Sequence, residues 1–117
     1  MILVDFDKTL ATYKSGAASN KFPLGEPIPA MVERVKYWLA KGKEVRIFTA
    51  RACRDNPYLT EDIANIKAWC KKHLGQELEV QNWKDFRAEA IWDDLAVSVE
   101  ANTGRVVRRL DMDIDNK

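Results

Sequence analysis

The chain has 117 residues, the size of one ordinary domain with a single packed core. Hydrophobic residues make up 46% of it and charged residues 32%, a balance typical of globular proteins. The formal net charge of +1 provides no overall attraction to nucleic acid or to an acidic membrane surface. We therefore expect one domain over residues 1–117, without a general electrostatic preference for either partner.

The sequence also predicts a cytoplasmic protein with no membrane segment. No apolar run approaches the roughly 20 residues that span a bilayer. The first predicted strand begins at residue 2, which leaves no room for a signal peptide. The two cysteines and the single histidine show no zinc-binding spacing, so we expect both thiols to be reduced.

The first predicted elements are a strand, a loop and a helix. Residues 2–4 are Ile, Leu and Val, which are typical of a buried strand. Residues 10–28 are rich in small residues, Gly and Pro, and predict a loop. A helix is expected to start at Pro29, to bury side chains recurring at helical spacing, and to end near Gly42.

The second half of the chain continues this alternation. Residues 44–51 predict a second strand, and a helix follows with Thr60 as its N-cap and Gly75 at its end. Further short strands are expected at residues 77–80, 88–92 and 95–100, and residues 101–107 predict a turn into one more. This order predicts an α/β fold, a three-layer Rossmann-like sandwich around a mainly parallel central sheet.

Polar residues stand where several of these strands end. In open α/β sheets the ligand crevice lies at the carboxyl ends of the strands. The side chains expected to meet there are Asp5, Asp7, Thr49, Arg51, Asp93 and Asp94. Thr9 continues the alternate spacing of Asp5 and Asp7 and adds a hydroxyl oxygen.

This set of residues suits phosphoryl transfer. Carboxylates that would repel one another call for a balancing cation, and Mg²⁺ prefers oxygen ligands shared with substrate phosphates. One aspartate of the first pair could attack phosphorus while the other moves a proton. The hydroxyl of Thr49 and the ammonium of Lys84 could hold the transferring group.

Four short motifs resemble those of the haloacid dehalogenase-like (HAD) superfamily. The stretch "VDFDKTL" resembles its first motif, a strand followed by Asp-x-Asp-x-Thr, and "RIFTA" resembles the second. Lys84 stands where the third-motif cation is expected, and "IWDD" resembles the acidic fourth motif. The chain looks closest to the small, nearly capless phosphatase-like members from bacteria and their phages.

The resemblance implies a role for each matching residue. Asp5 matches the nucleophile that becomes phosphorylated, and Asp7 matches the general acid and base. Thr49 matches the hydroxyl that binds the phosphoryl group. Lys84 matches the cation that steadies the nucleophile and the phosphate.

The resemblance also implies a magnesium site. Asp93 matches the fourth-motif ligand, and Asp94 matches a second ligand or its support. Asp5 through its carboxylate and Asp7 through its backbone carbonyl match the remaining ligands. The expected cofactor is therefore Mg²⁺.

Two residues depart from the family pattern. Lys8 stands where Gly is commonest in the first motif, and its ammonium could contact phosphate or point to solvent. The segment between Lys84 and Asp93 is too short for the usual helix, which could place Lys84 in a loop. The alternatives for its role are Lys67, Lys71 and Lys72.

No segment is long enough for the cap domain of many relatives, so the fold is expected to have little or no cap and an open site. An open site suits a bulky substrate such as a nucleic-acid end, or a homo-oligomer whose neighbouring subunit acts as a lid. Arg51 follows Thr49 as in phosphatase domains that trim polynucleotide 3′ ends. It could clamp a phosphate or form an ion pair with a neighbour such as Asp55.

We therefore expect a magnesium-dependent phosphatase that hydrolyses a phosphomonoester through an aspartyl-phosphate. The substrate would be a phosphorylated small molecule or a nucleic-acid end. A polynucleotide 3′-phosphatase is the alternative within the enzymes. A non-catalytic phosphate- or nucleotide-binding module and a receiver domain are alternatives from other classes. The receiver domain fits less well, because its phosphorylated Asp would follow a later strand.

Overall fold

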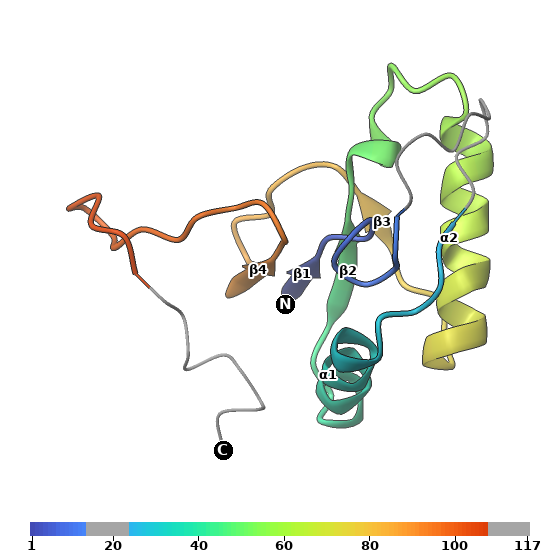
Figure 1. Ribbon diagram of the computed structural model, residues 1–117, viewed down its shortest axis with the longest axis horizontal. Helices are drawn as coiled ribbons and strands as arrows, with labels where there is room; N and C mark the ends of the chain where they lie inside the picture. Colours follow the sequence, from blue (N-terminus) through green and yellow to red (C-terminus); the bar gives the residue numbers. More distant parts are fainter. Residues whose placement is uncertain (14–23, 108–117) are drawn as a thin grey trace.

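The computed structural model describes residues 1–13 and 24–107 and contains a parallel four-stranded sheet (Figure 1). The strands are β1 (Ile2–Val4), β2 (Val45–Phe48), β3 (Val80–Gln81) and β4 (Ala90–Trp92). Their order across the sheet is β3-β2-β1-β4, and every pair is parallel. The predicted α/β class with a parallel central sheet is confirmed.

The strand register brings the ends of three strands together. Val4, the last residue of β1, pairs with Ile47 of β2 on one side and with Trp92 of β4 on the other. The chain therefore leaves β1, β2 and β4 at nearly the same level of the sheet. The residues that follow these strands meet at one edge, as expected of parallel strands.

Two α-helices flank the sheet in the described part of the chain, α1 (Pro29–Ala40) and α2 (Leu59–Leu74). Helix α1 starts at Pro29 as predicted, and Gly42, with φ +82°, follows its end. Helix α2 ends at Gly75, with φ +91°. The prediction that Thr60 caps α2 is wrong, because Thr60 lies inside the first turn and Tyr58 is the N-cap, without a capping side-chain bond.

The hydrophobic core lies between one face of the sheet and both helices. Alternate strand residues point into it, such as Ile2 and Val4 from β1 and Ile47 from β2, which are fully buried. Trp69 of α2 packs edge-on against Phe6, with ring centroids 5.0 Å apart. The core thus anchors the residues that lead from β1 into the site.

The end of the described chain, residues 95–107, differs from the prediction. Residues 95–100 do not form a strand, and their only β contact among the described residues is one antiparallel bridge between Val99 and Val106. This bridge closes the predicted turn, but Leu95 and Val97 remain 84% and 70% exposed. Apolar residues of strand type need a neighbouring strand to pair with, and this segment projects away from the sheet (Figure 1).

The connection between β3 and β4 contains no helix within residues 82–89, in agreement with its short length. Neither α1 nor α2, the α-helices of the described residues, has the length and apolar character needed to cross a membrane.

Candidate functional site

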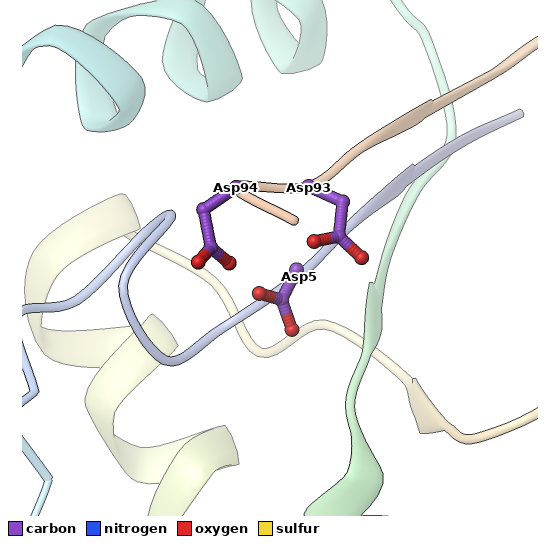
Figure 2. Close-up of side chains that lie close together, drawn as sticks. All are labelled: Asp5, Asp93 and Asp94. Carbon is purple, nitrogen blue, oxygen red and sulfur yellow. The ribbon is translucent and has the colours of Figure 1, made fainter. Parts of the chain in front are cut away.

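Three carboxylates gather where β1 and β4 end. Asp5 follows β1, and Asp93 and Asp94 follow β4; each offers an oxygen, and these oxygens all lie within 4.8 Å of one another (Figure 2). A backbone bond of 2.9 Å from the Asp5 N–H to the Trp92 carbonyl holds the two strand ends together. The structure therefore assembles the acidic cluster that the strand ends predicted.

Thr9 bridges this cluster through a tight turn. The N–H groups of Thr9, Leu10 and Ala11 all donate to the carbonyl of Phe6, which folds the chain back after β1. The Thr9 hydroxyl consequently lies 3.2 Å from both an Asp5 oxygen and an Asp94 oxygen. Its one hydrogen can serve either acceptor. Thr9 was not predicted as a site residue. The available signal was its position two residues after Asp7, which continues the alternate spacing of Asp5 and Asp7.

The cluster is electrostatically strained without a counter-ion. Burial, a hydrogen bond with Asp94 and the charge of Asp93 raise the pKa of Asp5 from 3.8 to about 7. The same hydrogen bond, together with the nearby charge of Lys8, lowers the pKa of Asp94. The proton that the cluster keeps toward neutral pH therefore lies on Asp5, whereas Asp94 is ionised. A hard divalent cation fits this donor set, because all its side-chain donors are oxygens and a cation would relieve the repulsion.

Asp7 faces Arg51 in a bidentate ion pair. Arg51 Nε donates to Asp7 Oδ2 at 2.7 Å, and Arg51 Nη2 donates to Asp7 Oδ1 at 2.9 Å. Arg51 Nη1 also lies 3.4 Å from Asp62 Oδ1. The expectation of an ion pair for Arg51 is thus correct in kind, although the partners are Asp7 and Asp62 and the guanidinium is only 8% exposed.

Thr49 follows β2 and is buried at the same edge of the sheet. It caps a short 3₁₀ helix, η1 (Ala50–Ala52), because its Oγ1 accepts the N–H of Arg51 at 3.2 Å. Its own N–H donates to Gln81 of β3. The capping bond uses an acceptor lone pair and leaves the hydroxyl hydrogen able to donate to an oxyanion.

Lys84 is exposed in the connection between β3 and β4. No hydrogen bond or ion pair joins it to Asp5 within the part of the chain that the structure describes. The role of Lys84 as the third-motif cation therefore stays a prediction. The charge of Lys8 does act on the cluster; this residue is exposed, and its ammonium lies 5.6 Å from the centre of the Tyr13 ring.

Asp62 and Asn56 complete the polar network and were not predicted. Asp62 is buried on the same helical stripe as Ile66 and Trp69, so an acid at a core-facing position was the available signal. Asn56 Nδ2 lies 2.8 Å from Asp62 Oδ2 and 2.8 Å from the carbonyl of Arg51. These two residues connect the first turn of α2 to the site.

No family model and no curated protein matches the chain. Among solved structures, a conserved protein from Bacteroides thetaiotaomicron is similar to it, with a TM-score of 0.54 and 24% sequence identity. The match covers 82% of this chain and 76% of that one. A likeness at this level of identity shows the fold alone, and it agrees with the α/β architecture described above.

Proposed function

We propose that the protein is a magnesium-dependent phosphatase of the HAD-like type, which hydrolyses a phosphomonoester through an aspartyl-phosphate at Asp5. The observation that carries this proposal is the convergence of oxygens from Asp5, Asp93 and Asp94 on one small space beside the Thr9 hydroxyl. A site that only binds an anion is expected to be lined by cationic side chains. Three carboxylates instead suit a site that holds a metal ion and supplies a nucleophile.

The residues that would hold Mg²⁺ are Asp5, Asp93 and Asp94 through their carboxylates, with the Asp7 backbone carbonyl as the ligand implied by the family resemblance. The ion would supply positive charge that balances the carboxylates and the phosphoryl oxygens. Thr49 would donate its hydroxyl hydrogen to a phosphoryl oxygen.

The reaction proceeds in two displacements at phosphorus. An Asp5 oxygen forms a bond to phosphorus while the bond to the leaving oxygen breaks, and Asp7, which enters this step in its protonated form, gives that oxygen its proton and becomes a carboxylate. A water molecule then attacks the phosphorus of the aspartyl-phosphate and passes a proton to Asp7. The bond from phosphorus to Asp5 breaks, which releases inorganic phosphate and restores both carboxyl groups.

The first test is hydrolysis of p-nitrophenyl phosphate by the wild type, by Asp5→Asn and by Asp55→Asn, with Mg²⁺ and with EDTA. Asp55 is an exposed carboxylate outside the site and controls for a general loss of negative charge. We expect magnesium-dependent turnover in the wild type and the control, and only background in Asp5→Asn. Equal rates in all three proteins would refute a nucleophilic role of Asp5.

Two further measurements separate the alternatives. Mg²⁺ binding by calorimetry in a protein that hydrolyses nothing would favour the non-catalytic binding module. Faster release of phosphate from a 3′-phosphorylated oligonucleotide than from the aryl phosphate would favour the polynucleotide phosphatase. The burial of Arg51 between Asp7 and Asp62 weakens that alternative, because the guanidinium would have to leave both carboxylates to clamp a DNA phosphate.

A further inference from the structure

We propose that Arg51 is a positioning residue, which holds the Asp7 carboxylate in the orientation needed for proton transfer and is itself held by Asp62 and Asn56. The inference rests on the proposed function, since it assigns the device that orients the proton donor of that reaction. It differs from the sequence-based expectation that Arg51 binds the phosphate of the substrate.

The contact with Asp7 is of the kind that fixes orientation. Two parallel bonds of 2.7 and 2.9 Å join one edge of the guanidinium to both oxygens of the carboxylate. A bidentate pair of this kind defines the plane of the carboxyl group as well as its position. The side chain of Asp7 is 24% exposed and that of Arg51 only 8%, so Asp7 is the member of the pair that is more accessible to a substrate.

Arg51 is in turn fixed from the side away from Asp7. Its Nη1 lies 3.4 Å from Asp62, which is 6% exposed at its side chain. Asn56 bonds both the Arg51 carbonyl and the second oxygen of Asp62, each at 2.8 Å, and accepts the Tyr58 N–H at 2.9 Å. The first turn of α2 and the loop before it therefore hold the guanidinium in place.

The charges around Arg51 also favour a role in positioning Asp7 over a role in binding the substrate phosphate. Arg51 is the cation between two carboxylates, Asp7 and Asp62, and its burial raises the cost of separating them. Asp7 occupies the Nε–Nη2 edge of the guanidinium, and Asp62 lies beside Nη1 at the other edge, so carboxylates meet both edges that could bind a phosphate bidentately. A substrate would thus meet Asp7 before Arg51.

This arrangement makes a prediction about leaving groups. A proton from Asp7 matters for an alkoxide, which leaves poorly without protonation, and much less for p-nitrophenolate, which leaves unaided. Disorienting Asp7 should therefore slow the hydrolysis of ethyl phosphate far more than that of p-nitrophenyl phosphate. Loss of a phosphate clamp would instead raise KM for both substrates alike.

The experiment measures kcat and KM for both substrates in Arg51→Gln, Arg51→Lys and the wild type, in the presence of Mg²⁺. For Arg51→Gln we expect kcat/KM on ethyl phosphate to fall by roughly 100-fold or more, the contribution typical of general acid catalysis. We expect kcat/KM on p-nitrophenyl phosphate to fall by less than about 10-fold, because this ratio does not include the later attack of water, in which Asp7 acts as the base for both substrates alike. Arg51→Lys should show the same pattern, because a single ammonium cannot form the two parallel bonds.

Asp62→Asn should show the same pattern at smaller amplitude, and Asp55→Asn should match the wild type. If Arg51→Gln unfolds because Asp62 is left buried and unpaired, the double variant Arg51→Gln/Asp62→Asn removes both charges and is tested in its place. Thermal unfolding identifies which variants are folded.

Equal loss on both substrates, or a loss confined to KM, would overturn the inference and leave the phosphatase proposal intact. A wild type that hydrolyses neither substrate would overturn the phosphatase proposal and the inference with it.

Discussion

Replacing Lys8 by glycine should make the turn after β1 more stable than replacing it by alanine, the reverse of the usual order. Lys8 lies between Asp7 and Thr9 and has φ +72°, in the left-handed region that favours glycine. Its N–H donates to the Ala11 carbonyl at 2.7 Å, which fixes this conformation. The geometry explains why glycine suits the position in the motif that this stretch resembles.

The magnitude follows from two opposing terms. In the folded state, a residue with a Cβ is destabilised by roughly 1–2 kcal/mol in the left-handed conformation. Glycine avoids this strain, but its more flexible unfolded chain lowers the stability of the protein by roughly 0.5–1 kcal/mol. Lys8→Gly and Lys8→Ala both lose the contact of the ammonium with the Tyr13 ring. Their difference therefore isolates the backbone, and Lys8→Gly should be the more stable by about 0.5–1 kcal/mol.

Urea denaturation of both variants in EDTA measures this difference, and equal m-values would show that unfolding exposes the same surface. Lys36 supplies the control, because it is exposed inside α1, where alanine is favoured. Lys36→Gly should be about 1 kcal/mol less stable than Lys36→Ala. The same order at position 8 would refute the claim that the turn requires a positive φ.

Three other outcomes can be checked with the same protein. In EDTA the contribution of Asp5 to the free energy of unfolding should fall by at most about 4 kcal/mol as pH rises from 3.8 to about 7, because the raised pKa of Asp5 makes the folded state hold its proton longer than the unfolded state; denaturation curves of the wild type and Asp5→Asn over this range measure it as their difference. Gly25→Ala should cost at least about 2 kcal/mol in such curves, since a Cβ would lie 1.8 Å from the Thr12 carbonyl oxygen, and an unchanged stability would contradict that close approach. Iodoacetamide should modify the partly exposed Cys53 but not Cys70, which is fully buried with its pKa raised to about 12 by burial, and mass spectrometry that found both thiols labelled in the folded protein would contradict this.

The positions of Asp5, Thr49 and Asp93 could be predicted from the sequence. Each directly follows a short apolar run, and the alternation of strands and helices implies parallel strands whose carboxyl ends coincide. The side-chain contacts could not be predicted in the same way. That Thr9 would bridge Asp5 and Asp94 depends on the turn around the Phe6 carbonyl, which the sequence pattern does not specify.

Two predictions of secondary structure were wrong because contacts elsewhere in the fold outweighed the local preferences of the sequence. Thr60 is a good N-cap residue, yet the N-cap of α2 is two residues earlier, at Tyr58, because the N–H of Leu59 bonds the Asn56 carbonyl in the preceding turn. Residues 95–100 have the composition of a strand, but composition does not say which strand would be their neighbour. A bridge from Val99 to Val106 is the pairing they make among the residues described here.

The partner of Arg51 was also misjudged, for a reason that can be corrected. Sequence proximity favoured Asp55, four positions away, whereas the actual partner, Asp7, is 44 positions away. Asp7 lies three residues beyond the end of β1, and Arg51 lies three residues beyond the end of β2. The register pairs Val4 with Ile47, so Asp7 corresponds to position 50 and Arg51 lies one residue further along, close to the same level of the sheet edge. Charged residues within about one position of register beyond adjacent parallel strands should therefore be paired before local partners are considered.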